Sequence, residues 1–181
     1  MLVGIVGALG AGKGTVVDYL KTIGYRHYSA SGYLKEVVLS RGGVPGRDAY
    51  SAVASEIRTA DTGGLAKVLY ERYRADGGGL AIIESLHDVG EVVFIKNNGG
   101  VVFALDADLE VRYTRAIARG SEKDNVTFAE FSAHIEREEN GGGHHNIRAA
   151  MQLADYVIMN NGTLAELHEQ VKKIMTLVVA K

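Results

Sequence analysis

A stretch near the amino terminus, GALGAGKGT at residues 7–15, places one lysine among four glycines. Glycine inside a helix costs about 1 kcal/mol relative to alanine, so this density of glycine indicates a backbone with an unusual conformation. Main-chain N–H groups that no side chain obstructs can converge on phosphate oxygens, and a lysine can reach the same oxygens as a point charge. The stretch therefore predicts a binding site for a polyphosphate.

The segments that flank this stretch are those that a phosphate-binding loop requires. The apolar run LVGIV at residues 2–6 predicts a buried strand, and the pattern around Lys13 predicts a helix whose positive end faces the loop. A strand, a glycine-rich loop and a helix in this order favour phosphate binding over a tight turn without a ligand. The expected contacts of the phosphate donor are Gly7, Gly10, Ala11, Gly12, Lys13, Gly14 and Thr15.

Four other short runs predict the remaining strands of a sheet, at residues 25–29, 80–84, 101–105 and 156–159. All except the first are almost continuously apolar, which is typical of strands covered on both faces. Helical patterns lie between the strands, and this alternation predicts a parallel sheet. We therefore expect an α/β fold with a five-stranded parallel sheet, in a single domain that spans residues 1–181.

Composition argues against several classes of protein. The net charge of −2 disfavours a general nucleic-acid binder, which usually carries a basic excess, and the chain has no cysteine for a disulfide or a thiolate zinc site. The apolar run at the start lacks a basic flank, and no stretch approaches the roughly 20 apolar residues of a membrane span. We expect a cytoplasmic protein with small-molecule partners, and neither nucleic acid nor a membrane.

The glycine-rich stretch has the form GxxGxGKGT, which resembles the nucleoside-monophosphate kinases, adenylate kinase among them. In most phosphate-binding loops a serine or threonine directly follows the lysine, whereas here Gly14 intervenes before Thr15. The resemblance implies a three-layer P-loop NTPase fold with a small lid, ATP as the phosphoryl donor, and Mg²⁺ held largely through water. It also implies that Thr15 faces the phosphates.

Two segments resemble the acceptor-binding parts of related kinases, and together they suggest a helical insertion over about residues 30–75. In SASGYLKEVV, Ser31 matches the start of the monophosphate-binding helices of adenylate kinases, although Tyr33 replaces their acidic residue. The stretch from Arg47 to Arg58 resembles archaeal-type adenylate-kinase-like and dephospho-coenzyme-A-kinase-like proteins. Arginine binds phosphate bidentately, so the resemblance implies acceptor contacts for both arginines, unless they are ordinary solvated helix residues.

Glu84 ends the apolar run LAIIE, next to the phosphate loop in such folds. An acid in this place can hold the hydration shell of Mg²⁺, so Glu84 and Thr15 are the expected metal-side residues, and Glu84 also borders the acceptor. The alternative is a polar strand end that faces solvent. Ser85 and His87 stand where relatives carry glycine and often arginine.

Three arginines, Arg112, Arg115 and Arg119, follow one another at spacings of three and four and therefore share one helical face. They repel one another unless a counter-charge arrives or neighbouring acids neutralise them. The resemblance places them in a lid over about residues 112–142, where guanidinium groups stabilise the charge of a transferring phosphoryl group. With Lys13 they are the expected catalytic residues, and Arg137 is a further lid candidate.

The segment LADYVIMNNGTLAEL resembles the end of dephospho-coenzyme A kinases and their relatives, where the turn after the last strand lies near the adenine of the donor. The resemblance implies that Asn160 contacts adenine through its backbone. The combined expectation is an ATP-dependent kinase whose acceptor is a nucleoside monophosphate or a similar small molecule. A dephospho-coenzyme A kinase is the second interpretation. The third is a nucleotide-binding or ATP-hydrolysing regulator, which Tyr33, Ser85 and His87 would favour.

Overall fold

The computed structural model describes residues 1–118, 126–140 and 146–180, and all their side chains except those of Arg47, His134 and residues 137–140. The strands are β1 (Leu2–Gly7), β2 (Arg26–Ser29), β3 (Ala81–Leu86), β4 (Val101–Asp106) and β5 (Tyr156–Met159). The helices are α1 (Lys13–Thr22), α2 (Ala30–Ser40), α3 (Arg47–Ala60), α4 (Gly64–Ala75), α5 (Val89–Asn97), α6 (Leu109–Ala118), α7 (Phe128–Asn140), α8 (Ile147–Gln152) and α9 (Leu164–Val179).

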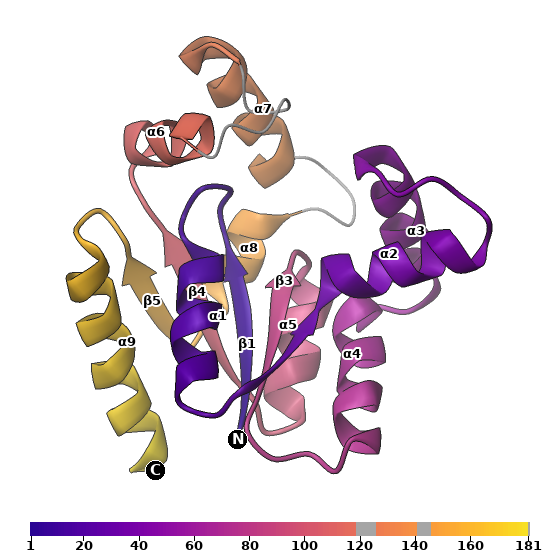
Figure 1. Cartoon of the computed structure of the whole chain (residues 1–181), viewed down its shortest axis with the longest axis horizontal. Helices are drawn as coiled ribbons and strands as arrows, with labels where there is room; N and C mark the ends of the chain where they lie inside the picture. Colours follow the sequence, from indigo (N-terminus) through magenta and orange to yellow (C-terminus); the bar gives the residue numbers. More distant parts are fainter. Residues whose placement is uncertain (119–125, 141–145, 181) are drawn as a thin grey trace.

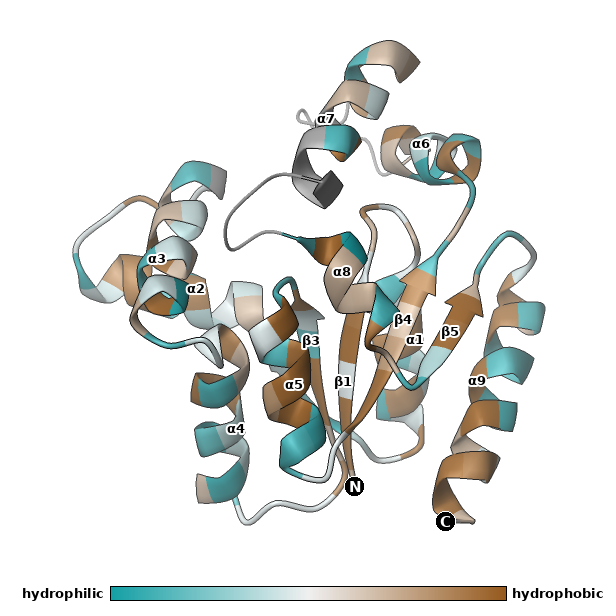
Figure 2. Cartoon of the chain, turned by 180° about the vertical axis from the view of Figure 1, so that it is seen from behind, coloured by the Kyte–Doolittle hydropathy of each residue, from teal (hydrophilic) through white to brown (hydrophobic). Residues whose placement is uncertain are grey.

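The strands form one parallel sheet in the order β2-β3-β1-β4-β5, with β1 at its centre (Figure 1). Three apolar strands, β1, β3 and β4, take the central positions, and the edge strand β5 is also largely brown in Figure 2. The polar strand β2 lies at an edge, where one side needs no partner. The expected five-stranded parallel sheet is thus confirmed.

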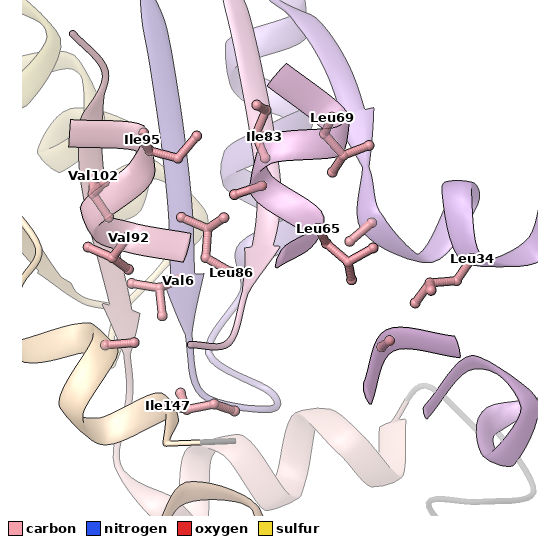
Figure 3. Packing of buried hydrophobic residues seen from close by; sticks show 14 of the residues in the cluster. Val6, Leu34, Leu65, Leu69, Ile83, Leu86, Val92, Ile95, Val102 and Ile147 are labelled. Atoms are coloured by element: carbon pink, nitrogen blue, oxygen red, sulfur yellow. The ribbon is translucent and has the colours of Figure 1, made fainter. Parts of the chain in front are cut away.

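Helices cover both faces of the sheet and make the fold three-layered. Helices α1 and α9 cover one face, where Val16, Leu20 and Leu167 pack on side chains of β1 and β4. On the other face, α4 and α5 pack on Ile83 and Val102 (Figure 3). Because β1 contributes buried residues to both cores, its carboxyl end is fixed in the middle of the molecule.

A third and much smaller core lies beyond the carboxyl ends of the strands. Ala116 of α6 packs there against Phe131 and Ile135 of α7, and Tyr113 lies against the same cluster. Helices α6 and α7 lie above the loop that follows β1 in Figure 1, in the part of the chain expected to form a lid. Closure of this part over a ligand stays a prediction.

A search of the helices in the described ranges for a segment long and apolar enough to span a bilayer finds no candidate.

The core between the sheet and helices α1 and α9 contains the aromatic residue at the centre of β4. Phe103 is fully buried, and its ring meets Tyr156 edge-on with 6.0 Å between centroids. We expect Phe103→Ala to lower the free energy of unfolding by about 3–5 kcal/mol, because it removes buried apolar contacts and leaves a cavity. Denaturant unfolding measures the change. The matched control is Val157→Ala on β5, because the side chain of Val157 is largely exposed. An equal loss of stability in both variants would contradict the expectation that the buried ring of Phe103 stabilises the fold.

Candidate active site

The loop between β1 and α1 has the backbone conformation that its glycines predict. Gly10 and Gly12 have φ angles of 80° and 97°, in the left-handed region that favours glycine. A Cβ atom at Gly12 would lie 2.4 Å from Nδ2 of Asn160, and one at Gly10 would lie 2.7 Å from the carbonyl oxygen of Arg112. Both positions therefore need glycine for conformation and for space.

The first turn of α1 opens directly onto this loop. Its N-cap is Gly12, which has no side chain to accept a hydrogen bond from the first N–H groups of the helix. Lys13 folds back over the loop, where Nζ donates to the carbonyl oxygens of Gly7 at 2.7 Å and Ala8 at 3.0 Å. The positive end of a helix and a lysine ammonium thus meet at one place, which is a favourable site for phosphate.

Asn160 joins three elements around the loop, and it is 5% exposed. Its Nδ2 donates to the carbonyl oxygen of Ala11 at 2.9 Å, which ties the end of β5 to the loop. Arg115 of α6 donates from Nη1 to the backbone oxygen of Asn160 at 2.7 Å. Arg115 and Asn160, expected in different roles, are therefore neighbours on the β5 side of the loop.

The arginines expected in the lid have different surroundings. Arg112 is 2% exposed, with Nε 3.9 Å from Oδ1 of Asp106 at the end of β4. Nη1 of Arg148, in the first turn of α8, lies 3.6 Å from the other oxygen of Asp106. Arg119 lies outside the described residues, as does the side chain of Arg137. Asp106 is a counter-charge that the sequence pattern did not identify, since it precedes the helix that carries Arg112.

Glu84 lies at the carboxyl end of β3, beside the strand that leads into the loop. Its Oε2 is 2.8 Å from Nε2 of His27 on β2, and its Oε1 accepts a hydrogen bond from the Ser85 hydroxyl. Burial, the largest single influence, raises the pKa of Glu84, but the hydrogen bonds from His27 and Ser85 and the charge of Lys13 together leave it below its ordinary value. The carboxylate is therefore ionised at neutral pH.

Ser85 has a φ angle of 68°, a conformation that is uncommon outside glycine. Ile5 pairs with Glu84 and Val6 with Leu86, so Ser85 is an extra residue that bulges out of the β1–β3 ladder. Bulges next to functional sites redirect the side chains around them. The geometry also explains why glycine would suit this position, and why the hydroxyl of Ser85 can turn back to Glu84.

The expected acceptor residues are placed unequally. Ser31 is exposed at the start of α2, with its hydroxyl 3.0 Å from that of Ser29. Arg47 begins α3, and its side chain lies outside the described part of the chain. Arg58, expected to contact an acceptor phosphate, instead donates from Nε to Oε1 of Glu91 at 2.9 Å. The side chain of Arg58 is 4% exposed and that of Glu91 is 0% exposed, so this ion pair is buried.

Oxygen donors suitable for Mg²⁺ are present beside the loop. Thr15 lies in the first turn of α1 and Glu84 at the end of the neighbouring strand. No group of three or more histidine, cysteine or acidic side chains that could hold a metal occurs within the described ranges. Mg²⁺ often keeps several waters and binds one or two protein oxygens together with nucleotide phosphates, so this sparse donor set fits it.

Comparison with known proteins decides the family. A family profile described as an AAA domain matches residues 3–141 of the chain. The chain belongs to the AAA domain family. The match includes the loop, Lys13 and Glu84 of this AAA domain, whereas Asn160 lies beyond the matched residues. The expected resemblance to P-loop proteins is confirmed.

Relatives of this AAA domain are similar over their full length. A UPF0200 protein from Thermococcus kodakarensis is 26% identical to this chain, and the alignment covers 100% of both proteins. A UPF0200 protein from Pyrococcus horikoshii is 27% identical over 99% of this chain and 98% of its own.

Solved structures show the same fold. TT1252 from Thermus thermophilus has a TM-score of 0.61 at 21% identity, covering 97% of this chain and 96% of its own. Shikimate kinase from Acinetobacter baumannii has a TM-score of 0.60 at 15% identity, and the superposition covers 99% of this chain and 93% of the kinase. Dephospho-CoA kinase from Campylobacter jejuni has a TM-score of 0.54 at 13% identity, and the superposition covers 98% of this chain and 96% of the kinase. The fold is that of P-loop kinases.

The buried pair of Arg58 and Glu91 generates a prediction about stability. Glu91 also accepts hydrogen bonds from the backbone nitrogens of Leu65 and His87. We expect Glu91→Ala to lower the free energy of unfolding by about 3–5 kcal/mol, because it leaves a buried guanidinium without its counter-ion. The control is Glu36→Ala, which breaks the exposed pair with Arg72 and should cost no more than about 1 kcal/mol. Equal losses in denaturant unfolding would show that the buried pair has no special role.

The lowered pKa of Glu84 predicts how its contribution to stability depends on pH. A carboxyl whose pKa is lower in the folded than in the unfolded chain stabilises the fold above its unfolded pKa, and this stabilisation disappears as the pH falls through its folded pKa. We expect Glu84→Gln to be less stable than the parent chain at neutral pH, by a margin that shrinks on acidification through this range. Denaturant unfolding at a series of pH values measures the margin, and a constant margin would refute the expectation.

Proposed function

We propose that the chain is an ATP-dependent phosphotransferase that moves the γ-phosphoryl group of ATP to a small acceptor. A nucleoside monophosphate is the acceptor that the sequence favours, and the hydroxyl of dephospho-coenzyme A is the alternative. The observation that carries the proposal is the convergence of the glycine-built loop, the open end of α1 and the Lys13 ammonium at one place. The P-loop kinase fold supports it.

The loop amides and Lys13 would hold the β- and γ-phosphates of the donor. Lys13 donates to two carbonyl oxygens of the loop, so its ammonium already lies beside the backbone that would hold the phosphates. Asn160 keeps the loop attached to β5 while this happens, since its side chain bonds to the Ala11 backbone. Phosphoryl transfer requires mainly positioning and charge stabilisation, which a fixed loop provides.

Thr15 and Glu84 would hold Mg²⁺ with the nucleotide, Thr15 through its hydroxyl and Glu84 through water. When bound, the ion neutralises the charge on the donor phosphates. The ionised state of Glu84 suits this role, because a carboxylate with a lowered pKa keeps its charge at neutral pH.

Arg112, Arg115 and Arg119 remain the proposed cations that stabilise the transferring group. Arg112 and Arg115 extend from α6, the helix that meets the loop at Gly10 and the end of β5 at Asn160. A shift of α6 would therefore change the position of both guanidinium groups relative to the phosphates. Arg115 also lies where a contact with the donor base is possible, since it bonds to Asn160.

On the acceptor side, Ser31, Arg47 and Glu84 are the proposed contacts. Arg58 could reach an acceptor phosphate only by leaving Glu91 buried without a partner, which is costly. We therefore propose that Arg58 acts on this side by fixing α3 against α5.

The role of Lys13 can be tested by binding. We expect Lys13→Ala to weaken MgATP binding by roughly 10- to 100-fold, the effect of losing a hydrogen bond between charged groups. Lys21→Ala is the matched control, because Lys21 lies on the same helix and its exposed side chain pairs with the exposed Asp18. Isothermal titration with MgATP measures both, and unchanged affinity in Lys13→Ala would contradict the donor site.

Measurement of ADP release from MgATP then distinguishes a phosphotransferase from a hydrolase and from a regulator without turnover. ADP release that depends on an added acceptor identifies a phosphotransferase, and we expect this result with a panel of monophosphates and dephospho-coenzyme A. Release without an acceptor would identify a hydrolase instead. MgATP binding without any turnover would indicate a regulator, and both of these results would overturn the proposed activity.

A further inference from the structure

Glu84 and His27 lie on neighbouring strands of the sheet and on the same face. His27 of β2 pairs with Ile82 of β3, and Glu84 follows Ile82 by two residues. Paired residues of neighbouring strands, and residues two apart on one strand, point to the same side of a sheet, so His27 and Glu84 are diagonal neighbours. Ile82 is buried in the core that also contains Val16 and Leu20 of α1. His27 and Glu84 therefore face the side of the sheet that carries α1.

The acid at the end of β3 is a glutamate, whose side chain has one more rotatable bond than the aspartate that holds Mg²⁺ in many P-loop NTPases. A longer side chain loses more rotamer freedom when a ligand fixes it, and this loss weakens binding. Contacts that fix the side chain before the ligand arrives remove the loss from the binding step. The surroundings of Glu84 therefore affect how well it can serve a metal ion.

Two hydrogen bonds fix the carboxylate of Glu84, one on each oxygen. Nε2 of His27 lies 2.8 Å from Oε2, and the Ser85 hydroxyl donates to Oε1. Oxygens of an ionised carboxylate only accept, so Nε2 of His27 is the donor. The two donors belong to different strands, the edge strand β2 and the bulge in β3. Together they determine the orientation of the carboxylate plane.

The Ser85 hydroxyl reaches Glu84 because of an unfavourable backbone conformation. A φ angle of 68° lies in the left-handed region, which costs a residue with a Cβ atom roughly 1–2 kcal/mol. Ser85 is outside the β1–β3 ladder, so the pairing of the strands does not explain a serine there. A residue that keeps such a conformation where glycine would be easier indicates that its side chain has a use.

The carboxylate that these residues hold is still open to a ligand. A carboxylate offers about four lone-pair sites, of which His27 and Ser85 use two. The side chain of Glu84 is 17% exposed, so water reaches it, and Lys13 lies near enough for its charge to act on it. Mg²⁺ usually keeps several of its waters in proteins. Glu84 can therefore accept hydrogen bonds from water next to the proposed phosphate site.

We infer that His27 and Ser85 are positioning residues, which hold the carboxylate of Glu84 in the orientation that receives the hydrated Mg²⁺ of a bound nucleotide. The inference rests on the proposed donor site. Neither residue contacts the nucleotide or the ion, and both act through Glu84. Removal of residues that orient a metal-binding side chain typically weakens metal affinity by about 10- to 100-fold.

Isothermal titration with ATP, once with Mg²⁺ and once with EDTA, tests the role of His27. We expect the parent chain to bind ATP more tightly with Mg²⁺. His27→Ala should weaken binding of MgATP about tenfold, the lower end of the range because Glu84 acts through water, and should leave the affinity for metal-free ATP unchanged. His27→Gln keeps an N–H donor and should restore part of the loss. An equal loss with and without Mg²⁺, or no loss, would overturn the role of His27.

His168→Ala is the matched control for the removal of an imidazole. His168 belongs to α9, and its ring stacks on that of Tyr19 in α1 with 4.6 Å between centroids. Its removal changes the same side of the sheet, and the affinity for ATP should equal that of the parent chain with and without Mg²⁺. A loss of MgATP affinity as large as in His27→Ala would overturn the inference, because the effect would not depend on Glu84.

Ser85→Gly distinguishes positioning from folding. Glycine adopts the left-handed region readily, so this variant should keep or raise the denaturant midpoint although it lacks the hydroxyl. We expect its MgATP affinity to fall by about 3- to 10-fold, the effect of one lost hydrogen bond, and its affinity for metal-free ATP to stay the same. Parent-like affinity for MgATP in Ser85→Gly would overturn the role of Ser85.

A double-mutant cycle tests whether His27 acts through Glu84. When Glu84→Ala is already present, His27→Ala should cause no further loss of MgATP affinity. A further loss would show that His27 acts on the ligand directly, which contradicts positioning. If the parent chain binds ATP equally well with Mg²⁺ and with EDTA, this inference fails and the donor site stands. If it binds ATP under neither condition, the proposed donor site fails as well.

Discussion

The constraint on which the site depends is the close approach of the loop backbone to its neighbours at Gly10 and Gly12. At Gly10 the chain passes under the backbone of α6, and at Gly12 it passes the side-chain amide of Asn160 at the end of β5. No residue with a Cβ atom fits either place without displacing one of these elements. The conformation of the loop therefore depends on segments that lie about 100 and 150 residues further along the chain.

The fold could be predicted from the sequence wherever an element is determined by residues that lie close together along the chain. Apolar runs identified four strands, each of which lies within a few consecutive residues. Strand β2 was harder to identify because RHYS is polar, and its edge position in the sheet explains this composition. The start of α9 carries a signal of the same local kind, a capping box of Thr163 and Glu166 whose two partners lie within one turn.

The contacts that define the site were not local and could not be predicted in the same way. Arg58 and Glu91 are 33 residues apart, and His27 and Glu84 are 57 residues apart. A helix pattern places Arg58 on a face, but only the packing of α3 against α5 decides that this face meets an acid. Ser85 illustrates the same limit, since its bulge depends on how β1 and β3 pair.

The small core between α6 and α7 has an evolutionary consequence. Its residues, Ala116, Phe131 and Ile135, form a cluster apart from the two that sandwich the sheet. Changes there would alter the packing of α6 on α7 without loosening the two cores of the sheet that carries the loop. Descendants of this chain can thus accept substitutions in α6 and α7 at little expense to folding, whereas substitutions in the central strands disturb both large cores at once.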